Sequence, residues 1–400
     1  MIGAVQSFAS HWTLDPDVVF LNHGSFGACP KPVLAAQAEL RARLEREPVD
    51  FMAREWEKRM DGARTALARF VGADPESLAF VTNATMGVNT VLRSLSFAPD
   101  DEILIVDQGY NACQNAARFV AERSRARVVA AHVPFPLASP DDVMSAILEQ
   151  VTGRTRLALV DHVTSATGLV YPIEAIVRSL SERGVDTLVD GAHAPGMLPL
   201  ALDALRAAYY TGNCHKWMCT PKGSGFLYVR EDRQKLVHPL VISHGANAQR
   251  QDRSRFRLEF DFTGTQDPTA WLVIPEAIRF MGSLLPGGWD ELRERNDALA
   301  LRGRVLLCEA LGIKAPAPET MIGSLAAVPL PPAPGAVEAP PLSTDPIMAT
   351  LYDRHRIEVV ASVWPASPGR ILRVSAQIYN QESQYARLAA ALQEALAAGE

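Results

Sequence analysis

The stretch from residue 186 to 226 constrains the fold more than any other part of the chain. One apolar run in it ends on Asp190, and a second, residues 207–210, leads into a polar segment that contains Lys216. Short apolar runs of this kind are typical of buried strands in a parallel α/β sheet, where functional side chains gather beyond the strand ends. The sequence therefore predicts that Asp190 and Lys216 meet at one edge of such a sheet.

The residues before this stretch alternate between short apolar runs and helix-like segments of roughly a dozen residues. This alternation predicts parallel βαβ units and therefore an α/β fold. The expected strands are 78–82, 103–107, 127–133, 157–163 and 187–190, and the expected helices between them are 83–97, 111–123, 140–152 and 173–184.

The bulk properties of the chain exclude several classes of partner. A net charge of −6 gives no reason to expect binding to nucleic acid or to an anionic membrane. No apolar run approaches the ~20 residues of a transmembrane helix, and the first residues do not resemble a secretory signal. The five cysteines lack metal-ligand spacing, so no metal site is expected and a cytosolic location with reduced thiols is predicted.

An acid and a lysine placed in this way suit pyridoxal phosphate (PLP). The lysine would form a Schiff base with the aldehyde, and the carboxylate would keep the ring nitrogen protonated so that the ring accepts electrons from a carbanion. Lys216 follows an apolar strand, whereas Lys222 lies in a turn, so Lys216 is the predicted Schiff-base residue. Asn83, Ala84 and Thr85 open a helix, whose free N–H groups would provide a phosphate site.

Three motifs in this order carry a family resemblance: DGAHAPG from Asp190, GNCHKW from Gly212 and PKGSGF from Pro221. Together with FLNHGSFG from Phe20, they resemble the class V aminotransferase family of fold-type I PLP enzymes, and most of all its isopenicillin N epimerase-like group. The resemblance covers residues 15 to 395. It implies a mainly parallel seven-stranded sheet flanked by helices, a smaller C-terminal α+β domain, and a homodimer with shared active sites.

With this resemblance, the chain is expected to divide into an N-terminal arm (1–30), a large PLP-binding domain (31–280) and a small domain (281–400). Eight prolines in residues 314–341 predict a meandering loop. The polar segment 244–268 is expected to be irregular, and its arginine-rich part, together with the proline-rich loop, to shape the mouth of the site. Further elements are expected at 18–21, 49–71, 267–284, 289–311, 358–363, 371–374 and 381–397, and a helix is expected to begin at Pro30.

The resemblance also assigns roles around the cofactor. His193 would lie against the ring or its 3-oxygen, and Asn213 and His215 would reach the phosphate. Thr265 resembles a residue that reaches the phosphate from the partner subunit. Tyr110 matches the position whose aromatic ring stacks on the cofactor. Many relatives carry asparagine at the position of Ser165, where it donates to the 3-oxygen; in this chain Thr164, Ser165 or Thr167 would replace that contact.

The substrate side of the site is assigned in the same way. Arg373 resembles the arginine that grips the substrate α-carboxylate, and Arg370 is the nearest alternative. Asn22 and His23 lie on the arm, which in this family folds over the substrate mouth. His23 is expected either to contact the substrate, to act as an acid or base, or to have a structural role.

The expected chemistry begins when Lys216 removes the Cα proton of an amino acid. Return of a proton on the opposite face, for which Tyr110 and His23 are the candidate acids, gives epimerisation. The alternatives are C–S β-elimination from a cysteine conjugate or sulfoxide, and transamination. Cysteine desulfurase is not expected, because its nucleophilic cysteine lies on a mobile small-domain loop and no cysteine follows Cys308. The alternative to an enzyme is a binding or structural protein with the same fold. The presence of both Asp190 and Lys216 argues against this alternative.

Overall fold

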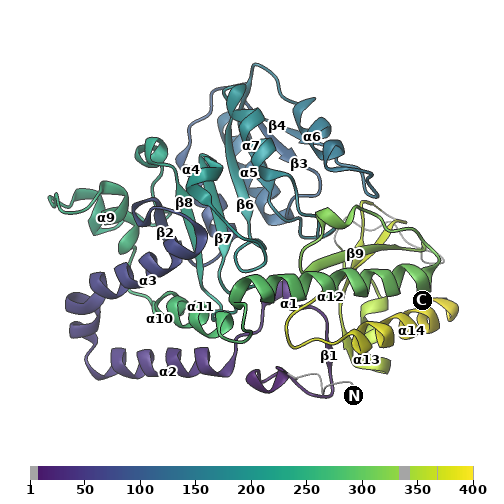
Figure 1. Ribbon diagram of the computed structural model, residues 1–400. Helices are drawn as coiled ribbons and strands as arrows, with labels where there is room; N and C mark the ends of the chain where they lie inside the picture. The colour runs from purple at the N-terminus through teal and green to yellow at the C-terminus, as the bar shows by residue number, and fades with distance from the viewer. Residues whose placement is uncertain (1–7, 333–342, 367, 400) are drawn as a thin grey trace.

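The computed structural model describes residues 8–332, 343–366 and 368–399. A larger lobe is built around one sheet, and a smaller lobe holds β9, α13 and α14, with the long helix α12 running beside both (Figure 1). Part of the predicted proline-rich loop, 333–342, and the first residues of the arm lie outside the described residues. Within the described ranges, no helix is both long enough and apolar enough to cross a bilayer.

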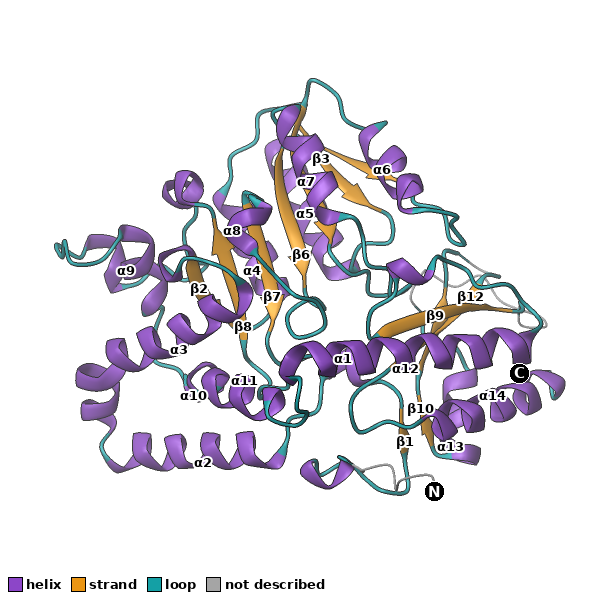
Figure 2. Ribbon diagram, viewed as in Figure 1, coloured by secondary structure: helices purple, strands orange, loops and turns teal. Residues whose placement is uncertain are grey.

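The large lobe contains a seven-stranded sheet in the order β2-β8-β7-β6-β5-β3-β4 (Figure 2). Neighbouring strands from β4 to β7 pair in parallel, and β8 pairs antiparallel with both β7 and β2. The expected parallel sheet is therefore confirmed, with one reversed strand. Its strands are β2 Leu78–Val81, β3 Glu102–Val106, β4 Arg127–Ala131, β5 Thr155–Asp161, β6 Asp186–Gly191, β7 Tyr209–Asn213 and β8 Gly225–Val229.

Helices cover both faces of this sheet because the side chains of each strand alternate between two apolar layers. Ile105 of β3 packs with Val91 of α4 and Ala117 of α5, whereas the adjacent Leu104 packs in a second cluster with Val177 of α7. Strands buried on both faces read as continuous apolar runs, which is why they are visible in the sequence. The covering helices are α4 Ala84–Ser94, α5 Asn111–Ser124, α6 Pro140–Leu148 and α7 Ile173–Glu182.

The remaining helices of the large lobe include α2, α10 and α11, which lie below β2 in Figure 1, and α9, which lies beside it. The expected helix over 49–71 begins as a π-helical turn, Asp50–Glu55, before α3. The prediction that residues 244–268 are irregular is wrong in part, because Phe256 and Phe260 are buried on one side of a short helix, α9. The elements here are α2 Lys31–Arg46, α3 Trp56–Val71, α8 Leu202–Leu205, α9 Arg255–Asp261, α10 Thr269–Leu272 and α11 Ile274–Gly282.

The small lobe contains a three-stranded antiparallel sheet in the order β11-β12-β9. The strand β9, Leu325–Leu330, lies inside the segment predicted to be a loop, so that prediction is wrong for these residues. An edge strand tolerates a proline because one side of it needs no ladder hydrogen bond, and Pro329 lies on such an edge. The other elements are α12 Gly288–Leu311, α13 Ile347–His355, β10 Ile357–Glu358, β11 Val360–Val363, β12 Arg370–Ser375 and α14 Glu382–Ala397.

The N-terminal arm joins the two lobes. Its strand β1, Val19–Phe20, pairs in parallel with β10 of the small lobe. The short helix α1, His23–Phe26, follows directly and contacts the loop after β7: the side chain of His23 lies 3.0 Å from the carbonyl oxygen of Lys216. The arm therefore carries a piece of chain from the small lobe to the edge of the large sheet where β6 ends.

Candidate active site

A cavity of about 500 Å³ lies at the ends of the parallel strands. It is lined from α1, from the N-terminus of α4, from the start of α5, and from the loops that follow β5, β6 and β7. The structure brings ten of the predicted site residues together around this one space. They are Asn83, Ala84, Thr85, Tyr110, Ser165, Asp190, His193, Asn213, His215 and Lys216.

Lys216 lies in the loop after β7, and its amine can be uncharged near neutral pH. Burial in the cavity wall, followed by the nearby positive charge of Arg373, lowers its pKa to about 7. Its Nζ lies 3.0 Å from Nε2 of His193. A lysine amine is nucleophilic only when it has lost its proton, so this environment prepares Lys216 to react with a carbonyl group.

Asp190 lies near the end of β6 and is buried. Its Oδ1 accepts a hydrogen bond of 3.0 Å from the backbone N–H of Ala192, and its Oδ2 accepts one of 3.1 Å from the thiol of Cys113. Burial raises the pKa of this carboxyl group, while both donors and the charge of Lys216 act in the opposite direction. The carboxylate is thus held in a fixed orientation on the cavity wall.

The N-terminus of α4 combines a cap with a polar corner of the cavity. The side chain of Asn83 caps the helix by accepting from the N–H of Met86 at 2.9 Å, and Asn213 Oδ1 accepts from the N–H of Ala84 at 2.8 Å. His215 donates from Nδ1 to the carbonyl of Ser224 at 3.1 Å, and no described residue forms a hydrogen bond with its Nε2. Burial lowers the pKa of His215 to about 4. An anion at this corner would favour its protonation.

Arg373 lies on β12 and is buried, yet none of the described acidic side chains forms an ion pair with it. Its guanidinium donates from Nη1 to the carbonyl of Ser165 and from Nη2 to Ser25 Oγ at 3.1 Å, and both serines line the cavity. Its buried Nε has no hydrogen-bond partner among the described residues. Burial lowers its pKa to about 10. Arg370, the alternative, instead forms a buried ion pair with Asp345 at 2.5 Å.

A model of the family described as Aminotransferase class-V matches residues 24–388. The chain belongs to the class V aminotransferase family. It is 38% identical to isopenicillin N epimerase of Amycolatopsis lactamdurans, over 96% of each chain. It is 30% identical to a probable chloroplastic L-cysteine desulfhydrase of Arabidopsis thaliana, over 96% of this chain and 84% of that one. A solved mutant of C-DES, with glycine covalently linked to its PLP cofactor, matches 97% of this chain and 100% of its own with a TM-score of 0.79 at 21% identity.

These comparisons confirm the predicted family and the fold-type I architecture, and PLP is the cofactor of this class V enzyme. The residues of the cavity fit that group. Lys216 offers an amine of lowered pKa for its aldehyde, Asp190 a buried carboxylate for its ring nitrogen, and the N-terminus of α4 the positive end of a helix dipole for its phosphate. All three features lie on one cavity of sufficient size for the cofactor and a small substrate.

His23 and Asn22 do not line the cavity, and the substrate contacts predicted for them are not supported. His23 is fully buried, with Nδ1 2.8 Å from the hydroxyl of Tyr379 and Nε2 3.0 Å from the carbonyl of Lys216. Burial lowers its pKa to about 3, so the ring is neutral, and its hydrogen bonds lie under the loop of Lys216. The acid or base role of His23 stays a prediction. Asn22 donates to Glu358 at 3.1 Å. The turn of α1 instead presents Ser25 and Phe26 to the cavity.

Of the three hydroxyl residues proposed to replace the relatives' asparagine, only Ser165 lines the cavity. Thr164 Oγ1 accepts from the N–H of Leu169 at 2.8 Å and lies 2.6 Å from Thr167 Oγ1, so these two hydroxyls hold their own loop together. The observed contacts of Thr164 are structural, and a cofactor contact by this residue stays a prediction. Periodicity could not separate these residues, because adjacent positions in a turn point in unrelated directions.

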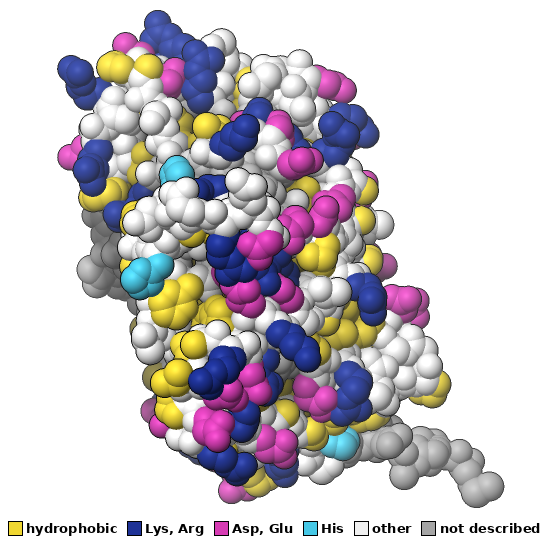
Figure 3. Space-filling view, turned by 90° about the vertical axis from the view of Figure 1, so that its left-hand side faces the viewer, with side chains coloured by type: hydrophobic (Ala, Val, Ile, Leu, Met, Phe, Trp, Pro, Cys, Tyr) yellow, Lys and Arg dark blue, Asp and Glu magenta, His cyan; other side chains and the backbone are white. Residues whose placement is uncertain are grey.

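Thr265 lies on an exposed loop after α9 and does not line this chain's cavity. The predicted role of segment 250–257 in shaping the mouth is also not supported, since none of its residues lines the cavity. Lys, Arg, Asp and Glu side chains instead form a dense patch on the side of the molecule that carries α3 and α9 (Figure 3). None of the described residues from the proline-rich segment lines the cavity either.

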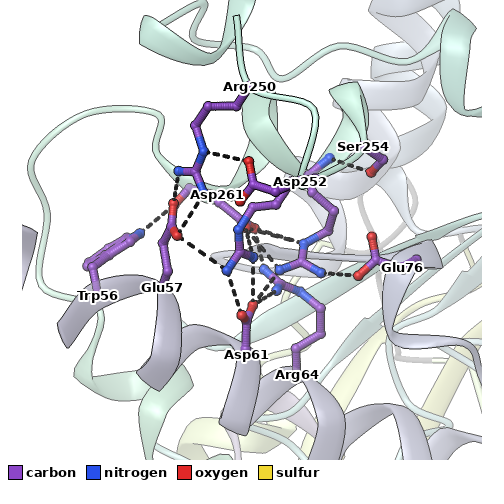
Figure 4. A network of polar contacts seen from close by, with 11 residues as sticks. Trp56, Glu57, Asp61, Arg64, Glu76, Arg250, Asp252, Ser254 and Asp261 are labelled. Atoms are coloured by element: carbon purple, nitrogen blue, oxygen red, sulfur yellow. Dashed lines mark hydrogen bonds and ion pairs between the residues drawn. The ribbon is translucent and has the colours of Figure 1, made fainter. Parts of the chain in front are cut away.

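That patch is a network in which arginines of segment 250–257 meet acids of α3 (Figure 4). Asp61 pairs with Arg253 at 2.7 Å and with Arg257 at 2.5 Å. Asp261 pairs with Arg257 at 3.1 Å and also with Arg64, whose side chain is almost completely buried. The network fixes α9 against α3 and so holds the chain that leads into the loop of Thr265.

Sequence reasoning did not single out three residues that the structure brings to the site. Asp161 lines the cavity beside Asp190, the thiol of Cys113 contacts Asp190, and Ser25 contacts Arg373. The one signal available for Asp161 is its place at the end of an apolar strand, the same signal that identifies Asp190. Cys113 and Ser25 lie in helices and carry no such signal.

Proposed function

We propose that this enzyme is an epimerase-like catalyst that inverts or exchanges the hydrogen at Cα of an amino-acid substrate. The observation that carries the proposal is that Lys216 and Tyr110 both line one cavity. Both side chains carry an exchangeable proton, and a two-sided exchange at carbon needs two such groups. The similarity to isopenicillin N epimerase over nearly the whole chain supports the same reading.

Lys216 is proposed as the covalent attachment point and as the base at Cα. PLP, when bound, supplies an electron sink that makes the Cα–H bond acidic. The amine then only has to take a proton at short range, and its lowered pKa leaves it uncharged for that purpose. The hydrogen bond from His193 holds the amine in place. Asp190, buried and oriented by two donors, would keep the ring nitrogen protonated.

Arg373 is proposed to hold the substrate α-carboxylate. A buried guanidinium without an acidic partner among the described residues is costly, and an entering carboxylate would complete its hydrogen bonds and charge. Ser25 and Ser165 orient the guanidinium from two sides. This anchoring fixes the Cα between the two proton-carrying groups.

Tyr110 is proposed both to stack on the cofactor and to return the proton from the face opposite Lys216. Its side chain is 44% exposed, and no hydrogen bond to its hydroxyl occupies that group among the described residues. Partial burial raises its pKa, so the phenol stays protonated at neutral pH and can act as an acid.

A second candidate is a C–S β-lyase, with transamination as a third outcome. The similarity to a probable L-cysteine desulfhydrase over 96% of this chain favours the lyase as the alternative. All reactions share the first proton removal, and they separate only in what leaves or returns afterwards. A desulfurase is not proposed, because all five cysteines are buried and none follows Cys308.

We also propose a homodimer with shared active sites. Thr265 is exposed beside Leu240 and Val241, two apolar residues that are themselves about half exposed. An apolar surface next to a polar loop is typical of a subunit contact. Thr265 would then reach the phosphate corner of the partner's cavity. The five cysteines are buried and form no disulfide, which is compatible with the predicted cytosolic location.

The test is incubation of the PLP-loaded enzyme with a panel of L-amino acids in deuterium oxide. Deuterium at Cα together with D-product supports the epimerase proposal. Pyruvate and ammonia from cysteine-type substrates would assign the lyase, and glutamate formed from 2-oxoglutarate would assign transamination. Lys216→Ala is the control that must abolish every one of these products. Loaded enzyme that exchanges no Cα hydrogen with any member of the panel contradicts the proposal.

A further inference from the structure

Asp161 and Asp190 form a pair of buried carboxyl groups at the edge of the sheet. The two residues are register partners on the parallel strands β5 and β6, so their side chains leave the same face of the sheet. Strands that pair in this way lie about 4.8 Å apart. Both residues are almost inaccessible, with 4% and 2% of their surfaces exposed, and both line the cofactor cavity.

The two carboxyl groups have unequal support for a negative charge. Asp190 accepts hydrogen bonds from the N–H of Ala192 and the thiol of Cys113. Asp161 receives only backbone N–H groups, those of Tyr110 and of Asp161 itself, and no described cation forms an ion pair with it. Gly109 packs so closely that an added Cβ would lie 3.1 Å from Asp161 Oδ2, which leaves little room for another partner.

The charged and titratable groups that face Asp161 do not compensate for a second negative charge. They are Asp190 on β6, Lys216 after β7, Cys113 on α5 and Tyr171 after β5. Lys216 is the only cation among them, it faces both carboxyl groups, and its amine is itself readily uncharged. Two carboxylates at this separation in a poorly solvated site repel one another, so one of them retains its proton.

We propose that Asp161 and Asp190 share one proton at the cofactor's ring nitrogen, with Asp161 as the neutral acid that leaves Asp190 as the only anion. Asp161 is thus a positioning residue that acts through Asp190. When Asp190 is replaced by a residue that cannot ionise, Asp161 loses its proton and carries the negative charge instead. This inference rests on the proposed PLP chemistry of the cavity, and it does not depend on which reaction follows. Burial and the charge of Asp190 raise the pKa of Asp161 far above its usual range, in agreement with this assignment.

A double-mutant cycle on PLP binding tests the shared proton, measured as the dissociation constant of PLP from the purified protein at pH 7. Asp161→Asn alone is expected to change it by less than about threefold, because the amide mimics the neutral acid. Asp190→Asn is expected to weaken binding only partly, because Asp161 then takes the charge. The double variant is expected to be weaker than the product of the single effects by at least about fivefold.

Asp107→Asn combined with Asp190→Asn is the matched control. Asp107 follows the neighbouring strand β3, accepts from the N–H of Val133 at 3.1 Å, and does not line the cavity. The dissociation constant of PLP in this double variant is expected to equal the product of the two single effects. Equal losses from Asp161→Asn and Asp190→Asn, or a double variant that equals the product of the two, would overturn the proposal.

Thermal unfolding against pH gives a second measurement that needs no reaction. A carboxyl group whose pKa is raised by folding stabilises the fold fully below its unfolded pKa near 4, and this contribution is lost as pH rises toward the folded pKa. The melting temperature of Asp161→Asn minus that of wild type should therefore increase between pH 4.5 and 8. A difference that is flat or falling over this range means that Asp161 is ionised, and it contradicts the proposal. Failure of wild type to bind PLP would instead overturn the cofactor chemistry itself.

Discussion

The amine of Lys216 and the imidazole of His193 share a hydrogen bond of 3.0 Å between Nζ and Nε2. The other ring nitrogen of His193, Nδ1, lies 3.4 Å from Nε1 of Trp217, which can only donate. The proton of the neutral imidazole is therefore assigned to Nε2, where it points to the lone pair of an uncharged lysine. Burial lowers the pKa of His193 well below its usual value, which keeps the ring neutral.

Replacing His193 by phenylalanine should slow the enzyme and change its pH dependence. A donor to the lysine lone pair favours the uncharged amine, so its loss raises the pKa of Lys216. We expect kcat to fall by about 10²-fold and the acidic limb of its pH profile to move to higher pH. Trp217→Phe removes the donor that fixes the tautomer of His193 but keeps the imidazole itself. It should therefore move the acidic limb to higher pH by a smaller amount than His193→Phe does. An acidic limb that stays in place in His193→Phe would show that the hydrogen bond does not control the lysine.

Lys216 should make the cofactor-free enzyme less stable at low pH. Its folded pKa of about 7 lies below the unfolded value near 10.4, so below pH 7 the fold carries the cost of a buried charge. This cost disappears as pH rises from 7 to about 10. Lys216→Met, which removes the charge, should thus be more stable than wild type at pH 6 by on the order of 5 kcal/mol, and the gain should vanish near pH 10. Urea unfolding at both pH values checks this.

The elements that sequence reasoning predicts correctly are those whose signal is local. The apolar strands β5 and β6, which carry Asp161 and Asp190 at or next to their ends, are visible because both of their faces are buried. The strand β9 is missed because it is a short apolar run within a segment that is rich in proline. This run forms a strand because it pairs with β12, which is distant in the sequence. The environment of His23 is missed because it depends on Tyr379, which is far away in the chain and carries no motif.

The same distinction holds for the site. Lys216, Asp190 and the start of α4 follow strand ends, so a motif can place them. Arg373 reaches the cavity only through contacts with Ser25 and Ser165, which come from the arm and from the loop after β5. No pattern within one segment indicates a contact between three distant parts of the chain. Only the resemblance to the class V aminotransferase family suggests that Arg373 belongs to the site.

Arg373 and Arg370 should respond differently to replacement by alanine, although both are buried on β12. Arg373→Ala should raise KM for the amino-acid substrate and lower kcat/KM by about 10²-fold or more, since a charge-assisted contact of 2–5 kcal/mol is lost. PLP binding should remain. Arg370→Ala leaves Asp345 buried without its partner and should mainly lower stability. An Arg373→Ala enzyme with unchanged KM would assign the carboxylate contact elsewhere.

His23 should behave as a structural residue in kinetic tests. His23→Ala removes hydrogen bonds to Tyr379 and to the carbonyl of Lys216, so the fold should lose about 1–3 kcal/mol in urea unfolding. The bound PLP should also dissociate faster, because the lysine loop is less well supported. The shape of the pH profile of kcat should not change. A lost limb in that profile would restore His23 as an acid or base.

The charged network between α3 and α9 should stabilise the fold through its buried member. Asp261→Asn removes the more buried of the two acids that contact the buried guanidinium of Arg64, and leaves it paired with the more exposed Asp61. Breaking a buried pair from one side costs about 3–5 kcal/mol, so a large shift of the urea midpoint is expected. Asp252→Asn is the matched control, because the one ion pair that Asp252 forms among the described residues is with exposed Arg250, and water already screens that contact. If the two variants lose equal stability, the network acts through its surface charges, and the burial of Arg64 is not what makes Asp261 important.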